Sequence, residues 1–287
     1  MHKRYRDMTK SEKRAKQMEA FSRILDVMDE LREKCPWDRE QTIKSLRTMT
    51  IEETFELSDA ILNDDIHNIS KELGDLLLHV IFYAKIGEEQ GAFDIVDVID
   101  RLCSKLIYRH PHVYSTVEVN NAGQVVQNWE QLKTKEKDGN KTILSGVPES
   151  MPSMIKASRM QEKACAVGFD WEKKEDVWCK VKEECAEVEK ELNDMAALQA
   201  DTTATEQQKA ECFERAQDEI GDLFFALINA ARLYKINPDT ALERTNKKFK
   251  RRFTYLENET IRKGLSLKEM SLEQMDAIWD EAKSKGL

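Results

Sequence analysis

The feature of this sequence that most restricts its fold is a set of four short motifs that occurs twice in the same order. In the first half they are EETFE from Glu52, ELGDLL from Glu72, the pair Lys105 and Arg109, and WEQLK from Trp129. In the second half they are EECAE from Glu183, EIGDLF from Glu219, the pair Lys248 and Arg252, and WDEAK from Trp279. Each half also opens with an acidic turn that contains tryptophan, CPWD at Cys35 and GFDW at Gly168. Four ordered matches indicate a duplicated module.

The modules are expected to be all-α. Ten glycines and five prolines are few breakers for 287 residues, and the abundant Glu, Lys, Leu, Ala and Met favour helix. Apolar residues recur at helical spacing, and no convincing strand run occurs. Helices are predicted through residues 21–31 and over residues 41–62, 66–89, 94–109, 126–137, 154–166, 173–194, 209–234, 238–263 and 272–285.

The Gly- and Pro-containing stretch 139–153 is predicted to be a linker between two modules, residues 1–138 and 154–287. A second polar stretch, rich in Thr, Ala and Gln, covers residues 193–208. It is interpreted as a surface insertion.

The acidic motifs are candidate metal ligands. Glu184 and Glu187 share one helix face, as do Glu219 and Asp222 on the next helix. If these helices pack antiparallel, four carboxylates converge, and their repulsion calls for a cation. Mg²⁺ prefers such oxygen ligands, at about 2.1 Å, and Mn²⁺ is the alternative. The first half repeats the set with Glu53, Glu56, Glu72 and Asp75.

A solvated acidic face is the better interpretation of any single pair of this kind. Here, however, the pairs adjoin apolar, core-like sequence and occur twice, which favours a metal site. Gly74 and Gly221 lie inside these helices, where each glycine destabilises the helix by about 1 kcal/mol relative to alanine. A close backbone approach or access for a ligand would explain them.

Cations follow the carboxylates along the chain. Lys248 and Arg252 share a helix face, and so do Trp279 and Lys283. Metal together with Lys and Arg is what a polyphosphate requires. Trp279 either covers a base or sugar or is a packing residue, and the sequence leaves both open.

Composition excludes several function classes. The net charge of −9 argues against binding a nucleic-acid backbone. Six scattered cysteines without a CxxC pair argue against zinc and indicate thiols in a reducing cytoplasm. No apolar run approaches the roughly 20 residues of a membrane span. The basic residues 1–16 lack the apolar core of a secretory signal and are interpreted as a frayed helix start.

Histidine is confined to the first half, so a site in the second half must activate water by metal and carboxylate. Neither half has the Glu-x-x-His pair of a di-iron bundle. No glycine-rich loop of the Walker type occurs.

The sequence resembles the MazG family of all-α nucleoside triphosphate pyrophosphohydrolases in its EExxE motif followed by ExxD. CPWDREQT, YRHPHVY, WEQLK and NKKFKRRF are similar to the two-domain bacterial form, and the similarity runs from about residue 21 to 285. The resemblance implies four-helix bundles that dimerise. It also implies Mg²⁺-dependent hydrolysis of nucleoside triphosphates to monophosphate and pyrophosphate, in nucleotide-pool house-cleaning.

The resemblance also implies roles for individual residues. The metal ligands would be Glu184, Glu187, Glu219 and Asp222. The substrate-binding residues would be Arg215, Asn246, Lys248, Arg252, Trp279 and Lys283. The catalytic residues would be Glu184, Asp218, Lys248 and Arg252, with either acid as the proton acceptor.

The first half departs from this pattern. Lys71 stands in place of the acid at Asp218, Asn68 in place of Arg215, and Cys103 in place of Asn246. A lysine beside metal carboxylates weakens a cation site by like-charge repulsion. The second half is therefore predicted to be the main catalytic centre.

Two other functions stay open. One is a narrower enzyme specific for dUTP, dCTP or phosphoribosyl-ATP, although the long duplicated form favours broad activity. The other is a helical interaction module with vestigial acidic sites. The intact carboxylate and cation sets in the second half argue against that module.

Overall fold

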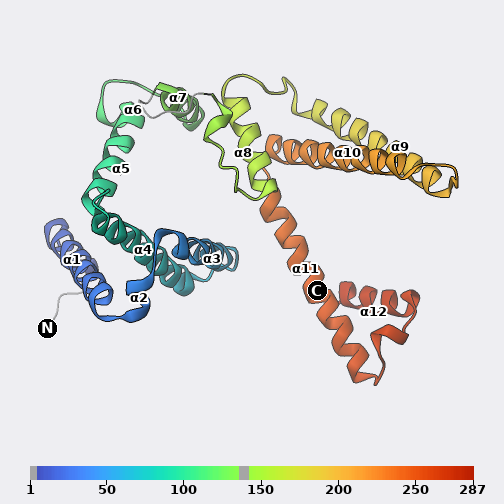
Figure 1. The fold of residues 1–287 in the computed structure, drawn as a ribbon, viewed down its shortest axis with the longest axis horizontal. Helices are drawn as coiled ribbons and strands as arrows, with labels where there is room; N and C mark the ends of the chain where they lie inside the picture. The colour runs from blue at the N-terminus through green and yellow to red at the C-terminus, as the bar shows by residue number, and fades with distance from the viewer. Residues whose placement is uncertain (1–4, 136–141) are drawn as a thin grey trace. The chain divides into compact units, whose positions relative to one another are not determined.

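A computed structural model describes residues 5–135 and 142–287, and within these ranges it contains helices and loops but no strand (Figure 1). The predicted all-α class is confirmed. The chain divides into two compact units, Met1–Glu118 and Val119–Leu287. The module boundaries at 138 and 154 stay a prediction, and residues 139–141 of the proposed linker lie outside the described ranges.

The first unit is built on two packed helices, α3 (Ile43–Leu62) and α4 (Ile66–Glu89). A tight turn joins them, and Asp65 caps α4 by accepting from the backbone of Asn68. The remaining helices of this unit are α1 (Lys10–Lys34), α2 (Pro36–Glu40), α5 (Ile95–Arg109) and α6 (Pro111–Tyr114).

The core of the first unit lies where α1 and α3 meet α4. Met28 from α1 and Leu46 from α3 pack against a run of apolar residues on α4 that includes Ile81, Phe82 and Ile86. α4 is apolar nearly all round in this segment, which is why it can be covered from both sides.

The second unit contains a longer pair, α9 (Val177–Ala200) and α10 (Glu206–Leu233). α8 (Ser153–Ala166) packs on α10, and α7 (Ala122–Lys135) packs on α8. α11 (Pro238–Arg262) follows α10 and packs mainly on α12 (Leu272–Ser284). Figure 1 shows α11 and α12 as a hairpin that extends beyond the end of α10.

The predicted surface insertion at residues 193–208 is mostly helical. α9 continues to Ala200 and α10 begins at Glu206, so only residues 201–205 form a turn. The expected helix ends at 194 and 209 were wrong because Met, Ala, Leu and Gln in this stretch are strong helix formers. Thr205 and Gln208 then form a capping box that starts α10.

Within the described ranges, no helix combines the length and the apolar character that crossing a bilayer requires.

Candidate metal and substrate site

The carboxylates of the second unit converge between α9 and α10. Ligand oxygens of Glu184, Glu219 and Asp222 all lie within 4.8 Å of one another. Glu184 is buried and forms an ion pair of 2.6 Å with Lys180. The fourth predicted ligand, Glu187, is exposed at the edge of this group. Loss of hydration and then the charges of Glu184 and Glu219 raise its pKa.

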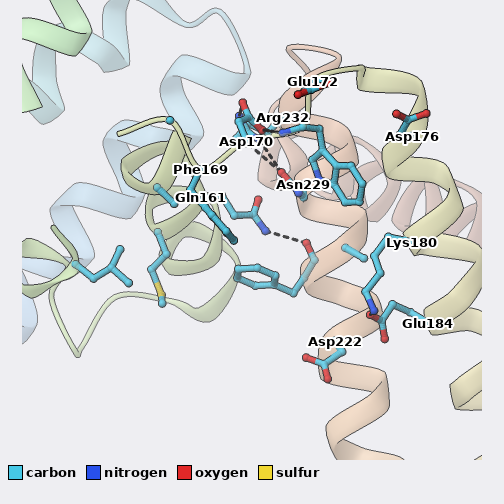
Figure 2. Close-up of a pocket in the computed structure, with 17 residues that line it drawn as sticks. Gln161, Phe169, Asp170, Glu172, Asp176, Lys180, Glu184, Asp222, Asn229 and Arg232 are labelled. Atoms are coloured by element: carbon cyan, nitrogen blue, oxygen red, sulfur yellow. Dashed lines mark hydrogen bonds and ion pairs between the residues drawn. The ribbon is translucent and has the colours of Figure 1, made fainter. Parts of the chain in front are cut away.

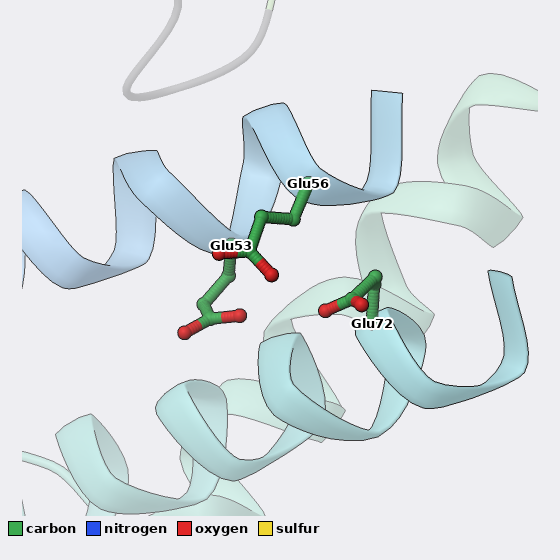
Figure 3. A group of neighbouring side chains, drawn as sticks. All are labelled: Glu53, Glu56 and Glu72. Atoms are coloured by element: carbon green, nitrogen blue, oxygen red, sulfur yellow. The ribbon is translucent and has the colours of Figure 1, made fainter. Parts of the chain in front are cut away.

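The first unit holds a similar group. Oxygens of Glu53, Glu56 and Glu72 lie within 4.8 Å of one another between α3 and α4 (Figure 3). Asp75 is outside this set of three, but after burial it is the main cause that raises the pKa of Glu53. Lys71 contacts Glu72 at 3.0 Å and Asp75 at 3.8 Å. Lys71 thus pairs with this group much as Lys180 pairs with Glu184 in the second unit.

Both groups fit a hard divalent cation, because they offer clustered carboxylate oxygens and no sulfur or imidazole. In the first group, the Oε2 atom of Glu72 is buried without a hydrogen-bond partner, and a metal ion could coordinate this oxygen. Close packing does not explain the two helical glycines, because a Cβ atom on Gly74 or Gly221 would meet no atom within 4 Å. Of the two explanations for these glycines, only access for a ligand remains.

A cavity of about 950 Å³ adjoins the second carboxylate group (Figure 2). Glu184, Asp222 and Lys180 line one end of it. The remaining wall comes from α8, from α10 and from the loop between α8 and α9, with Met160, Gln161, Phe169, Asp170, Trp171, Phe225, Asn229 and Arg232 among its residues. The sequence analysis did not predict these wall residues. The acidic turn GFDW at Gly168, which matches CPWD at Cys35 in the first half, was the signal for this loop.

An ion pair fixes that loop to α10. Arg232 donates from Nη1 to Asp170 at 3.0 Å and from Nη2 to the same carboxylate. It also donates from Nε to the side chain of Asn229 at 3.1 Å. Hydrogen bonds from Arg232 lower the pKa of Asp170 from 3.8 to about 2. This ion pair therefore holds the loop on α10 without a bound ligand.

Replacing Asp170 by asparagine is expected to lower the free energy of unfolding at pH 7 by about 2 kcal/mol. The folded-state pKa of Asp170 lies below the unfolded value, so its contribution is present above about pH 4 and is lost as the pH falls towards 2. Urea unfolding of wild type and variant from pH 7 to pH 2 should show the difference shrinking through that window. Glu162→Gln, which breaks only a surface pair with Arg159, is the control and should change stability little.

The predicted cations lie on the α11–α12 hairpin and do not line this cavity. Arg252 donates to the backbone carbonyl of Leu287 at 2.7 Å and lies 5.9 Å from the ring centre of Trp279. The ring centres of Trp279 and Phe249 lie 5.2 Å apart, so Trp279 is a packing residue within this chain. Lys248 is exposed on α11.

The other predicted site residues have partners close by. Lys283 pairs with Asp280 at 2.9 Å, and Asn246 donates to Glu243 at 3.2 Å. Arg215 pairs with the buried Glu191 at 2.9 Å. Asp218 is exposed one residue before Glu219. The structure thus brings three of the predicted metal ligands together, and none of the predicted substrate-binding residues lines the cavity beside them.

Comparison with known proteins gives the same family over nearly the whole chain. A family model described as the MazG nucleotide pyrophosphohydrolase domain matches residues 41–114. A nucleoside triphosphate pyrophosphohydrolase of Escherichia coli strain K12 is 36% identical over 271 residues, 93% of this chain and 98% of that protein. The nucleoside triphosphate pyrophosphohydrolase/pyrophosphatase MazG of Thermotoga maritima is 38% identical over 268 residues, 92% of this chain and 95% of the relative. Uncharacterized protein YabN of Bacillus subtilis is 42% identical over 266 residues, 92% of this chain and 51% of its own length.

Proposed function

The chain belongs to the MazG family of nucleotide pyrophosphohydrolases, and we propose that it hydrolyses nucleoside triphosphates, ribo and deoxyribo, to the monophosphate and pyrophosphate with Mg²⁺. It is a hydrolase that acts on acid anhydrides. The observation that carries the proposal is the convergence of Glu184, Glu219 and Asp222 within 4.8 Å beside a cavity of about 950 Å³. That arrangement offers a metal-binding end and a chamber large enough for a nucleoside.

The carboxylates divide the chemical work. Glu184, Glu187, Glu219 and Asp222 would hold the cation, which when bound would neutralise phosphate charge and acidify water. Water attacks the α-phosphorus, the bond to the bridging oxygen breaks, and pyrophosphate leaves. Either Glu184 or Asp218 accepts the proton of that water. Mn²⁺ is expected to replace Mg²⁺, because it accepts the same oxygen ligands.

Cations complete the site. Lys180 already pairs with Glu184 where both line the cavity. Lys248, Arg252 and Lys283 neutralise the leaving pyrophosphate, with Arg215, Asn246 and Trp279 as further substrate contacts. The hairpin that carries Lys248 does not line the cavity of its own chain. We therefore propose that a second copy supplies this lysine and that the functional form is a homodimer.

Exposed apolar side chains on the same helices support a dimer. Phe213 and Phe224 on α10 are 57% and 59% exposed, and Phe249 on α11 is 56% exposed. Large apolar surface of this kind marks interaction sites in proteins.

The direct test is pyrophosphate release from a panel of nucleoside triphosphates, with Mg²⁺ and with excess chelator. We expect release with Mg²⁺, background rates with the chelator, and recovery when Mg²⁺ is restored. In ¹⁸O-labelled water the label should enter the monophosphate. Label found only in pyrophosphate would instead place the attack on the β-phosphorus and contradict the mechanism.

A further inference from the structure

The cavity wall contains one buried polar atom without a partner. Gln161 on α8 is only 6% exposed. Its Nε2 donates to the backbone carbonyl of Phe225 on α10 at 2.9 Å. That bond fixes the amide orientation, since the reverse would set two oxygens against each other. The Oε1 atom is left buried with no hydrogen bond from the described residues.

A buried acceptor without a donor is unfavourable, so Gln161 is a poor choice for packing alone. The first unit shows the apolar solution: there the helix before the carboxylate pair inserts Met28, which packs with Ile81 and Phe82. The second unit has an amide in its interior beside a cavity instead. A ligand that donates a hydrogen bond would remove the cost.

The ends of the cavity differ in charge. Lys180, Glu184 and Asp222 mark the end where the metal and phosphates are proposed to bind, as Figure 2 shows. At the other end the guanidinium of Arg232 is already engaged by Asp170 and Asn229. It is therefore satisfied without an anionic ligand. This end suits the uncharged part of a nucleotide.

Aromatic side chains also line the cavity and could contact a planar ring. Phe169, Trp171 and Phe225 line the cavity with Gln161. Figure 2 shows the Gln161 oxygen directed towards the side where Asp170 and Asn229 lie. Aromatic faces and one fixed acceptor are the components of a pocket for a nitrogen heterocycle.

We propose that Gln161 Oε1 accepts an N–H of the nucleobase and that the cavity selects bases that carry such a donor. This inference rests on the proposed function, since it assigns the base end of the same site. It makes Gln161 a specificity-determining residue that does not touch the reacting phosphate. A base without an N–H donor would leave the acceptor unpaired and displace any water that served it.

The test compares ATP with purine riboside triphosphate, which lacks only the amino donor, and with ribose 5-triphosphate, which lacks the base. Wild type should prefer ATP over purine riboside triphosphate by about tenfold to hundredfold in kcat/KM, the range for one unpaired buried group. Gln161→Met, similar in size but without the acceptor, should remove that preference. Its rate on ribose 5-triphosphate should stay at the wild-type value.

Met160→Leu is the matched control, because Met160 lines the same cavity from the same helix and the change removes no hydrogen bond. It should keep the preference for ATP. An equal loss on all three substrates in Gln161→Met, or an unchanged preference, would overturn the assignment.

Binding separates this inference from the proposed activity. Calorimetric titration with adenosine and purine riboside needs no hydrolysis, and the same discrimination should appear in wild type and vanish in Gln161→Met. If no triphosphate is hydrolysed, the proposed function fails while this titration still decides the role of Gln161. If triphosphates are hydrolysed and wild type binds both nucleosides equally, only the base assignment fails.

Discussion

Replacing Glu184 by glutamine is expected to lower kcat/KM for nucleoside triphosphates about 10²- to 10³-fold, the scale of losing several kcal/mol of charge stabilisation by a metal. Glu184 is 5% exposed and lies in the carboxylate group beside the cavity. Glutamine keeps its size but removes the negative charge that holds the cation. Steady-state pyrophosphate release at saturating and limiting Mg²⁺ measures the effect, and the Mg²⁺ concentration for half-activity should rise.

Glu72→Gln provides a control matched in burial and pairing. Glu72 is 4% exposed, contacts Lys71 at 3.0 Å and belongs to the carboxylate group of the first unit. Most activity should survive this change, because the first unit has Lys71, Asn68 and Cys103 where the second has Asp218, Arg215 and Asn246. If Glu72→Gln abolished release and Glu184→Gln did not, the chemistry would belong to the first unit, which the family model matches.

Two inactive variants are expected to restore activity to each other when they share a dimer. Glu184→Gln removes a carboxylate and Lys248→Ala removes a hairpin cation. If each site combines the carboxylates of one chain with the hairpin of the other, the mixed dimer contains one intact site of two. Its activity should reach about half that of wild type, against roughly 10²-fold losses in each parent homodimer.

A second mixed dimer gives the opposite result and serves as the control. When both changes are on one chain and the partner is wild type, every shared site carries one defect, and activity should stay low. Each dimer is purified through two different affinity tags, and its mass is checked by light scattering. Half activity in this second dimer and none in the first would show that each chain builds its own site. A monomer in light scattering would contradict the homodimer.

Helix positions were predictable because apolar spacing and terminal residues both act locally. The helix expected over residues 66–89 is α4, Ile66–Glu89, where Asp65 provides the start. The helix ends predicted at 194 and 209 were wrong, because the Ala, Leu and Gln residues of the stretch 193–208 favour helix although the stretch is polar. The family resemblance carried by EExxE and ExxD is confirmed by relatives that match along nearly the whole chain.

The metal group was easier to predict than the cavity. Two residues three apart on a helix share a face whatever surrounds them, so Glu219 and Asp222 could be placed together from spacing alone. Gln161 and Phe225 are 64 positions apart, and their contact depends on how α8 lies on α10. Spacing within one helix carries no information on such a contact. The same holds for Lys248 and Arg252 on the hairpin. Their spacing places them on one helix face, but it does not say which carboxylates lie near them.

The contrast between Met28 and Gln161 bears on why a duplicated chain keeps both copies. Most mutations that create a binding site reduce the stability of the fold that carries it. In this chain, the core of one copy places Met28 among apolar side chains, while the other places an unpaired amide beside a cavity of about 950 Å³. Duplication lets the two demands evolve on separate interiors. Attempts to engineer new substrate preference should therefore begin in the second unit, and attempts to raise thermal tolerance should begin in the first.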